Sequence, residues 1–353
     1  MSKRLLIAAS GTGGHIFPAL AVAQELSQWS IEWLGVPDRL ETSLVPERYP
    51  LHTIGVTGFQ GRPGLGTLKT VFSLIKGIWD TRSILQRGGF EGVFTTGGYI
   101  AGPAILAARS LGLPVILHES NAMPGKVTRL LGPWCDRVAI GFPNAAQHLA
   151  KSQTQWTGTP VRAEFWQSMA LGLPIPDGVP VIVVMGGSQG AVRVNQLVRE
   201  AAPAWFEAGA WVVHLTGDRD PDATALQHPQ YITMPFYRNI AALMQRADLA
   251  ISRSGAGTLT ELAAAKTPAI LIPYPTAADD HQTYNARSFV DVGAARMYPQ
   301  KDLDGPTLQG LVLELLQDSD RRQRMTRNAA EAAVPDSAQK LADLIETTLG
   351  GQS

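Results

Sequence analysis

A unit that recurs four times along the 353 residues constrains the fold more than any other feature of the sequence. Each unit is a short apolar run, then a loop rich in glycine, then a helical pattern, and the apolar runs are residues 5–9, 93–96, 181–185 and 249–252. Short unbroken apolar runs that alternate with helices are typical of parallel strands covered on both faces. The sequence therefore predicts a doubly wound α/β fold.

Two of the units lie in each half of the chain, and glycine and proline residues cluster between the halves, from Gly158 to Gly178. We therefore expect two Rossmann-like lobes, residues 1–160 and 161–336. A last helical pattern within residues 337–353 follows Pro335 and is expected to cross back to the first lobe. In such folds ligands bind beyond the carboxyl ends of the strands, so two facing lobes predict a ligand-binding cleft between them.

Composition excludes several classes of protein. Thirty Lys and Arg balance thirty Asp and Glu, so no global field attracts nucleic acid or an acidic membrane. Cys135 is the only cysteine, which excludes a disulfide framework and favours a reducing compartment. The apolar run at residues 5–9 is too short for a secretory signal, and no uncharged apolar run reaches the ~18 residues of a membrane span. We expect a cytoplasmic protein whose membrane contact, if any, is local and peripheral.

The glycine loops suit a phosphate group. A glycine loop that leads into a helix presents bare backbone amides and the positive end of the helix dipole. One such loop is equally well explained as a tight turn, but four of them favour an anionic ligand. The dinucleotide-binding pattern requires a third glycine and, about 20 residues later, an acidic residue at the end of the second strand. Here Ile16 stands in place of the third glycine, and the next apolar run ends in Gly35 and Val36 without an acid, so the match is weak. The P-loop pattern does not occur.

No metal site and no cofactor are predicted. Asp218 and Asp220 have the D-x-D spacing that many metal-dependent sugar transferases use, but a solvated polar loop explains them better. The seven histidines include no pair at the spacings H-x-H or H-E-x-x-H.

One segment of the first lobe, residues 62–87, is locally basic. It contains one acid, Asp80, and five basic residues, which are Arg62, Lys69, Lys76, Arg82 and Arg87. Its apolar residues recur at helical spacing, at Leu68, Val71, Phe72, Ile75, Ile78 and Trp79. The pattern fits a helix packed on its own sheet with a basic outer face, or an interfacial helix whose basic residues face anionic lipid.

Taken in order, the motifs resemble one family closely, the MurG family of UDP-N-acetylglucosamine transferases of peptidoglycan synthesis. The motifs span nearly the whole chain and comprise residues 11–15, 96–99, 118–121, 158–162, 186–191, 253–256 and 280–282, with Pro18, Glu261, Asn285 and Ala286. Two departures are Ser120, where the family usually has glutamine, and residues 237–239, which replace a more acidic stretch near the expected uracil site.

The resemblance implies a GT-B fold of two Rossmann-like lobes. It also implies that UDP-N-acetylglucosamine is the donor, held mainly by the second lobe. The implied acceptor is undecaprenyl-diphosphate-linked N-acetylmuramoyl-pentapeptide, reached peripherally at the cytoplasmic face of the cell inner membrane. The reaction would make the disaccharide precursor of the cell wall, on which cell shape and cell division depend.

In the family, the 4-hydroxyl of the acceptor displaces UDP in one inverting step, which needs a base and donors for the charge that grows on the diphosphate. The resemblance suggests Arg162 and the amides of Ser188, Gln189 and Gly190 as those donors. His15 is the first choice for the base, because imidazole titrates near neutral pH. Its alternative role is only to orient the loop or the acceptor diphosphate.

Glu119 is the second choice for the base, with hydrogen bonding to backbone after the strand as its alternative role. The resemblance places the other binding residues by substrate. Those on the acceptor side are Thr12, Gly13, Gly14, Tyr99 and His118. Those on the donor side are Tyr237, Ala256, Gly257, Thr258, Glu261, Gln282 and Asn285, with Asn121 reaching the acetamido sugar from across the cleft.

Among the donor residues, Glu261 is expected to accept the ribose hydroxyls; its alternative role is an acid in the first turn of a helix.

Two other functions compete with the transferase. A UDP-N-acetylglucosamine 2-epimerase, or another GT-B enzyme, would bind the same donor without a lipid acceptor. A non-catalytic protein that binds sugar nucleotides is the rival from another class. The motifs at residues 12–15 and 118–121 favour the transferase.

Overall fold

The structure is a computed structural model that describes residues 3–56, 65–187 and 191–350. The chain forms two compact units. Unit 1 consists of residues 1–162 and 334–353, and unit 2 of residues 163–333. Each unit is described by itself.

Unit 1 is built on a seven-stranded parallel sheet with the order β3-β2-β1-β4-β5-β6-β7. The strands are β1 (Arg4–Ala8), β2 (Ser30–Gly35), β3 (Leu51–Thr53), β4 (Gly92–Thr95), β5 (Val115–Glu119), β6 (Arg137–Ile140) and β7 (Thr154–Trp156). β1, β4 and β5 are buried almost throughout. The prediction of short apolar strands in a parallel sheet is therefore confirmed for this unit.

The helices of unit 1 pack on both faces of the sheet. They are α1 (Gly13–Glu25), α2 (Glu41–Leu44), α3 (Leu65–Gly88), α4 (Ala101–Ser110), α5 (Lys126–Leu131) and α12 (Ser337–Gly350), with short 3-10 turns η1 (Gly132–Trp134) and η2 (Pro143–His148). Side chains alternate along β1: Leu6 faces the core shared with α3 and α4, and Leu5 faces the core shared with α1 and α12. The last helix of the chain thus belongs to the core of unit 1.

Unit 2 has a six-stranded parallel sheet with the order β10-β9-β8-β11-β12-β13. The strands are β8 (Val181–Met185), β9 (Trp211–Leu215), β10 (Tyr231–Met234), β11 (Leu249–Ser252), β12 (Ala269–Leu271) and β13 (Ala295–Met297). This sheet confirms the second half of the predicted doubly wound architecture.

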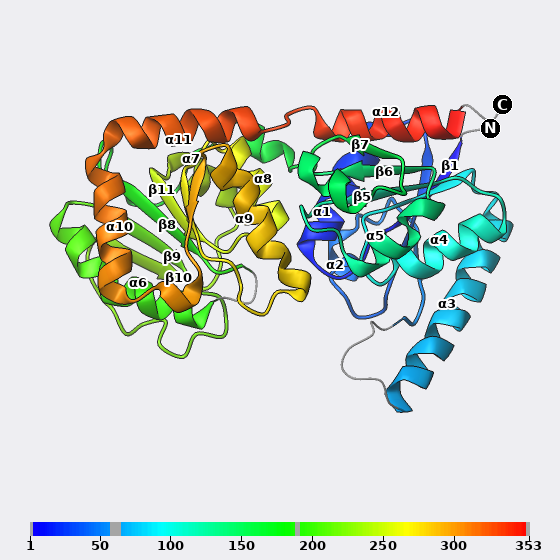
Figure 1. Ribbon diagram of the computed structural model, residues 1–353, viewed down its shortest axis with the longest axis horizontal. Coiled ribbons are helices and arrows are strands. Elements are labelled where there is room, and N and C mark those ends of the chain that lie inside the picture. Colours follow the sequence, from blue (N-terminus) through cyan, green and yellow to red (C-terminus); the bar gives the residue numbers. More distant parts are fainter. Residues whose placement is uncertain (1–2, 57–64, 188–190, 351–353) are drawn as a thin grey trace. The chain divides into compact units, whose positions relative to one another are not determined.

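The helices of unit 2 are α6 (Val192–Glu207), α7 (Ile240–Arg246), α8 (Ala256–Ala264), α9 (His281–Asp291), α10 (Gly305–Gln317) and α11 (Ser319–Ala332), with 3-10 turns η3 (Ala163–Trp166), η4 (Ala278–Asp280) and η5 (Gln300–Asp302). Leu197 of α6 and Val312 of α10 share one buried core with Ile182 of β8. α7, α8 and α9 lie on the other side of the sheet (Figure 1).

Helix α3 carries apolar side chains on two faces. Leu85 is buried in the core of unit 1 and Ile78 packs against the same core, whereas the side chains of Phe72 and Trp79 are 70% and 67% exposed. Arg62 and the side chains of Leu68 and Lys69 lie outside the described residues. The apolar residues of the sequence pattern therefore do not all serve the packing of the helix on its own sheet.

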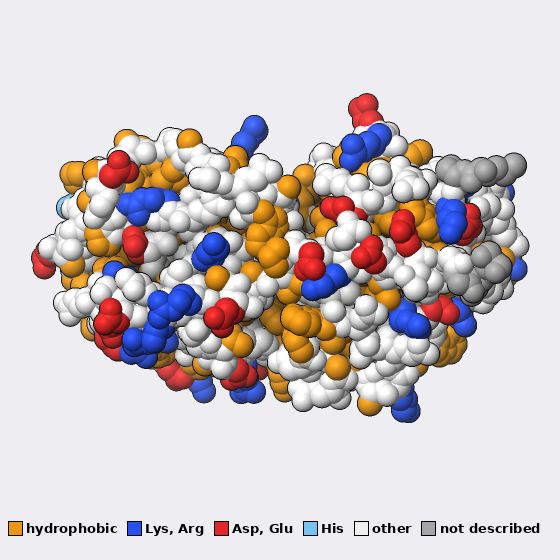
Figure 2. Space-filling view, turned by 90° about the horizontal axis from the view of Figure 1, so that it is seen from above, with side chains coloured by type: hydrophobic (Ala, Val, Ile, Leu, Met, Phe, Trp, Pro, Cys, Tyr) orange, Lys and Arg blue, Asp and Glu red, His pale blue; other side chains and the backbone are white. Residues whose placement is uncertain are grey.

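Charge is mixed over the surface. On the face shown in Figure 2, Lys and Arg side chains lie interspersed with Asp and Glu side chains, as the equal numbers of basic and acidic residues led us to expect. No helix among the described residues has both the length and the apolar character needed to cross a bilayer.

Candidate active site

The candidate site in unit 1 lies at the switch point of its sheet. The strand order reverses direction between β1 and β4, and in open α/β sheets such a point opens a crevice at the carboxyl ends of the strands. The loop that follows β1 leads into α1, whose first residue is Gly13, and the loop that follows β4 holds Gly97 and Gly98. Both loops are the glycine motifs singled out in the sequence.

His15, the third residue of α1, joins these two loops. Its Nδ1 lies 2.7 Å from the carbonyl oxygen of Thr96. A carbonyl oxygen only accepts hydrogen bonds, so Nδ1 carries a proton, and in the neutral form of the ring it is Nε2 that has the free lone pair. Gly97 and Gly98 have φ values of +86° and +74°, which favour glycine, and a Cβ at Gly98 would lie 3.6 Å from Nε2 of His15. The backbone thus holds the ring with its basic nitrogen toward the glycine turn.

The first turn of α1 presents backbone donors. Thr12 precedes the helix, and its carbonyl accepts from the amides of His15 and Ile16 at 3.0 and 3.2 Å. The amides of Gly13 and Gly14 precede the first helical hydrogen bond and point out of the helix end. Gly14 is exposed, so this end can receive an anion.

Glu119, the second candidate base, is buried at the end of β5 with both oxygens bonded. Oε1 accepts from the backbone amide and the side-chain amide of Asn121, each at 3.0 Å. Oε2 accepts from the amide of Gly125 at 3.0 Å and the hydroxyl of Thr128 at 2.6 Å. The carboxylate therefore holds the β5–α5 loop and orients Asn121.

His118 is fully buried, unlike Tyr99, which is 52% exposed. Nε2 of His118 lies 3.1 Å from the carbonyl of Gly158, and burial lowers the pKa of His118 to about 4, so that the ring is neutral. The Arg162 guanidinium lies 4.9 Å from the centre of the Phe17 ring in α1. Since a Cβ at Gly13 would lie 2.8 Å from that ring, Arg162 belongs to the surroundings of the α1 end.

Sequence reasoning missed Glu41, the first residue of α2. Its side chain is fully buried, and its two oxygens accept from the amide of Gly11 at 3.2 Å and the amide of Val36 at 2.7 Å. Periodicity gave no sign of it, because a single acid after a strand reads as a loop residue. The signal was Gly35, whose missing side chain makes room for Glu41.

Unit 2 has an equivalent switch point between β8 and β11. The loop after β11 leads into α8 through Gly255, so the amides of Ala256, Gly257 and Thr258 form the open end of that helix. Apart from the backbone of its own helix, no atom in the described part of the chain lies within 4 Å of where a Cβ of Gly257 would be. The predicted diphosphate donors Ser188, Gln189 and Gly190, which follow β8, lie outside the described residues.

Helix α9 is tied to this loop by two amide side chains. Oε1 of Gln282 accepts from the amides of Ser254 at 3.3 Å and Tyr274 at 2.9 Å. The buried Asn285 donates from Nδ2 to the carbonyl of Ser254 at 3.2 Å. Gln282 and Asn285 therefore bind backbone on one side, and the side-chain NH₂ group of Gln282 is the part that suits a ligand hydroxyl.

Glu261 and Tyr237 occupy different settings. Glu261 is half-buried and lies beyond the first turn of α8, so the alternative role of a first-turn acid does not apply. The hydroxyl of Tyr237 donates to the carbonyl of Leu171, and the Asn239 side chain donates to the carbonyl of Ala170 at 2.7 Å. The segment at residues 237–239 thus binds the chain that enters unit 2.

The D-x-D pair divides between surface and interior. Asp218 is exposed, as expected for a solvated loop, but that interpretation is wrong for Asp220. Asp220 accepts from Arg199 and from Asn195, both at 2.7 Å, and this ion pair is buried because Asn195 and Arg199 of α6 pack over the loop. Among the described residues no group of three or more His, Cys, Asp or Glu side chains is placed to hold a metal ion.

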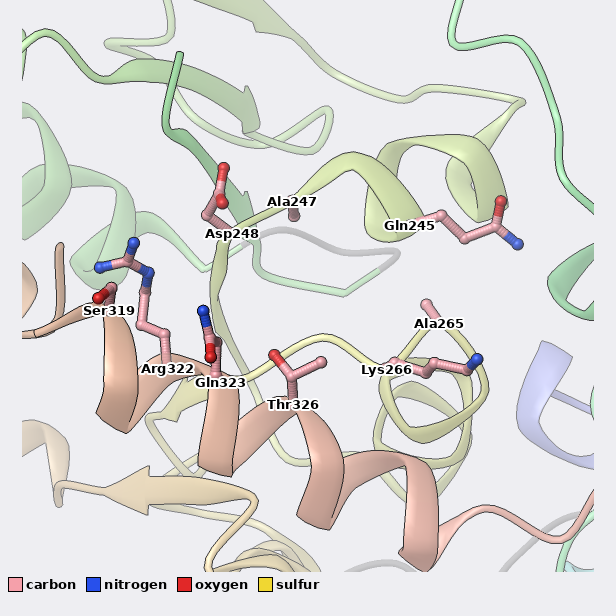
Figure 3. Close-up of a pocket in the computed structure, with 9 residues that line it drawn as sticks. All are labelled: Gln245, Ala247, Asp248, Ala265, Lys266, Ser319, Arg322, Gln323 and Thr326. Atoms are coloured by element: carbon pink, nitrogen blue, oxygen red, sulfur yellow. The ribbon is translucent and has the colours of Figure 1, made fainter. Parts of the chain in front are cut away.

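A pocket of about 410 Å³ in unit 2 lies apart from these loops (Figure 3). Its lining includes Asp248 and Lys266, which precede β11 and β12, so it opens at the amino ends of the strands. Several of its polar groups bind main chain: Gln245 and Arg322 donate to carbonyls, and Asp248 accepts from the amide of Val181 at 2.9 Å. The pocket therefore does not belong to the switch-point site.

Comparison with known proteins agrees with this geometry. The N-terminal domain model of glycosyltransferase family 28 matches residues 5–140, and the C-terminal domain model matches residues 181–341. A UDP-N-acetylglucosamine--N-acetylmuramyl-(pentapeptide) pyrophosphoryl-undecaprenol N-acetylglucosamine transferase from Trichormus variabilis is 63% identical over 345 residues, which cover 97% of each chain.

Solved structures give the same assignment. The crystal structure of Acinetobacter baumannii MurG aligns with a TM-score of 0.78 and 31% identity, covering 98% of this chain and 99% of that one. The calicheamicin glycosyltransferase aligns with a TM-score of 0.71 over 100% of both chains, but at 18% identity it shows the fold alone. The GT-B fold and the family resemblance expected from the motifs are confirmed, and the chain belongs to glycosyltransferase family 28 and, within it, to the MurG transferases.

Proposed function

We propose that this chain transfers N-acetylglucosamine from UDP-N-acetylglucosamine to the 4-hydroxyl of lipid-linked N-acetylmuramoyl-pentapeptide, with inversion at the anomeric carbon. The observation that carries the proposal is His15, whose protonated Nδ1 donates to the Thr96 carbonyl at 2.7 Å beside an open helix end. A base next to amides that suit a diphosphate is what a lipid-diphosphate acceptor requires. The names of the close relatives support the same donor and acceptor.

In the proposed step, Nε2 of His15 takes the proton from the 4-hydroxyl of the acceptor, while the oxygen of that hydroxyl bonds to the anomeric carbon of the donor sugar. The bond between that carbon and the diphosphate oxygen breaks, and its electron pair leaves with UDP. The amides of Gly13 and Gly14 hold the acceptor diphosphate. The charge that grows on UDP is offset by backbone amides, each of which can contribute about 2.7 to 4 kcal/mol to the barrier.

Unit 2 is assigned the donor. The amides of Ala256, Gly257 and Thr258 bind its diphosphate together with Ser188, Gln189 and Gly190, Glu261 accepts the ribose hydroxyls, and the Gln282 amide binds a sugar hydroxyl. In unit 1, Glu119 serves as a positioning residue for Asn121, because four donors already occupy its oxygens.

The test is transfer of labelled N-acetylglucosamine from UDP to a lipid-linked muramoyl-pentapeptide acceptor. Donor alone is the control, since a 2-epimerase would release product sugar without acceptor. We expect transfer only with both substrates. Turnover of the donor by itself, without transfer by folded protein, would establish the epimerase instead.

We also propose that unit 1 docks peripherally on an anionic bilayer through α3, which would place the protein at the cytoplasmic membrane face. Phe72, Ile75 and Trp79 recur at helical spacing and are 70%, 49% and 67% exposed. Lys76 on the same helix pairs with Asp80 at 2.6 Å, and Arg82 donates to the Ser110 carbonyl at 2.8 Å. Exposed aromatic residues beside cations suit the headgroup region.

Vesicle binding tests the docking surface. Phe72→Ser with Trp79→Ser should weaken binding to anionic vesicles and slow transfer to membrane-embedded acceptor, yet leave transfer to a short-chain soluble acceptor nearly unchanged. Phe236→Ser is the matched control, because Phe236 is also 70% exposed but belongs to unit 2. Binding should also fall with added salt, since anionic attraction is screened within about 8 Å. Equal slowing on both acceptors would mean that α3 is only structural.

A further inference from the structure

Glu41 fills the place at the end of β2 where a nucleotide-binding fold keeps an open carboxylate. In a dinucleotide-binding fold an acidic side chain after the second strand accepts a ribose hydroxyl, while the glycine loop after the first strand takes the pyrophosphate. In unit 1 the glycine loop follows β1, and β2, the second strand of the chain, is one of the two strands that pair with β1. Glu41 reaches back to that corner from α2.

The contacts of Glu41 leave no room for a ribose. The side chain is fully buried, and a Cβ on Gly35, the last residue of β2, would lie 2.7 Å from its Cγ. Oε1 lies 2.7 Å from the Val36 amide, and Oε2 lies 3.2 Å from the Gly11 amide. Each oxygen already accepts an N–H bond, and the full burial of the side chain keeps a ribose hydroxyl from reaching the remaining lone pairs.

The same contacts hold the loop that carries the candidate base. Gly11 has a φ of +102° and begins the stretch that ends in Gly13, Gly14 and His15. Among the described residues Glu41 makes no ion pair, so its charge is offset by backbone amides and by the nearby start of α1. A carboxylate so placed pulls the first glycine of the loop toward β2.

We propose that Glu41 is a positioning and specificity residue of unit 1. It fills the position that a bound nucleoside would occupy and fixes the glycine loop, so that the loop binds a diphosphate that carries no nucleoside. This inference rests on the proposed function, in which unit 1 receives a lipid diphosphate. It also explains why the acidic residue of the dinucleotide pattern was missing from the end of the second strand: the acid comes a few residues later and faces inward.

The variants are Glu41→Ala and Glu41→Gln, with Asp136→Asn as matched control. Asp136 also accepts a backbone amide in unit 1, that of Val115 at 2.8 Å, but it does so at the amino end of β5. Each variant is assayed for the KM of both substrates, for kcat, for UDP affinity and stoichiometry by calorimetry, and for the free energy of unfolding in urea.

Glu41→Ala should raise the KM for the acceptor about tenfold to a hundredfold, the cost of one hydrogen bond to a charged group, and leave UDP affinity within about twofold. Glu41→Gln should lie between it and the wild type, because the amide oxygen still accepts from Val36 while its NH₂ group faces Gly11. Asp136→Asn should lower stability without changing either KM. The wild type should bind one UDP per chain.

An acceptor KM and a kcat both unchanged in folded Glu41→Ala would overturn the inference, as would equal increases in the KM of both substrates or a second UDP site in the wild type. A wild type that transfers nothing would instead refute the proposed function. In that case the amide resonance of Gly11 in glycine-labelled protein tests the loop by itself. It should shift in Glu41→Gln and stay in place in Asp136→Asn, and no shift in Glu41→Gln would overturn the inference.

Discussion

Replacing His15 by asparagine separates the two roles that its position allows. The Nδ2 of asparagine occupies the place of the histidine Nδ1, so His15→Asn can keep the hydrogen bond to the Thr96 carbonyl, which is 2.7 Å long in the wild type. The variant has no group in place of Nε2. It therefore keeps the anchor between the β1 and β4 loops and removes the base.

The magnitude follows from this separation. General base catalysis contributes about 10² to 10⁴ in rate, or about 2.7 to 5.4 kcal/mol of the barrier. If His15 is the base, kcat should fall by that factor in His15→Asn while UDP affinity stays unchanged. His15→Gln is the complementary variant, because it fills the place of Nε2 and loses the anchor.

Single-turnover transfer with both substrates saturating measures the chemical step directly, and calorimetric UDP binding checks that unit 2 is intact. His15→Asn with kcat within about fivefold of the wild type would refute the reasoning, because the anchor alone would then suffice. His15 would in that case only orient the loop, and the base would have to be sought elsewhere, with Glu119→Gln as the next variant.

Further predictions concern the donor, the metal-free step and stability. Glu261→Ala should weaken UDP affinity about tenfold to a hundredfold in calorimetry, because a ribose hydroxyl loses its charged acceptor; Glu331→Ala, at an exposed glutamate of unit 2, is the control, and an unchanged affinity would remove Glu261 from the site. Transfer should persist in excess EDTA, and a loss that Mg²⁺ or Mn²⁺ restores would contradict the metal-free step. Asp220→Asn should lower the free energy of unfolding by about 3 to 5 kcal/mol in urea, because the buried Arg199 keeps its charge without a partner; a loss under about 1 kcal/mol would mean that the pair behaves as a surface pair. Burial lowers the pKa of His118 from 6.5 to about 4, so as the pH falls the unfolded chain takes up a proton at this residue before the folded chain does. The contribution of His118 to the free energy of unfolding is therefore complete above pH 6.5 and is lost towards pH 4, at up to about 1.4 kcal/mol per pH unit. This slope, measured by urea unfolding at several pH values, should be smaller in His118→Gln.

The strands and the glycine loops could be predicted from the sequence, because each is determined by residues that are neighbours along the chain. Residues 181–185 and 249–252 are the strands β8 and β11 as predicted, and the glycine loops after β1 and β4 lie where the apolar runs end. An apolar run can be covered on both faces only in a central strand, so composition over a few residues is enough to find it. The order of the strands, and hence the position of the two switch points, depends on contacts between distant segments. The repeated pattern predicts a doubly wound fold but not which strands are neighbours.

The parts of the site that were not predicted depend on contacts between distant residues. Thr96 accepts from His15 across 81 positions in sequence, and Asp220 accepts from Arg199 across 21. No local pattern distinguishes such an aspartate from a solvated one, which is why the interpretation of Asp220 failed. The same holds for the amphipathic pattern in α3, since spacing shows that side chains share a face but not what covers that face.

Glu41, Glu119 and Asn285 suggest a common reason for these limits. Each is buried and binds the backbone of a loop at the carboxyl end of the sheet, at 3.2 Å or less. A glycine loop that must offer its amides to a ligand cannot satisfy them within itself, and it has no side chains with which to pack. Its conformation must therefore be fixed from the protein side by polar groups that hydrogen-bond to the backbone. Such groups look like ordinary acids and amides in a sequence, yet the distance between the amides and the base depends on them.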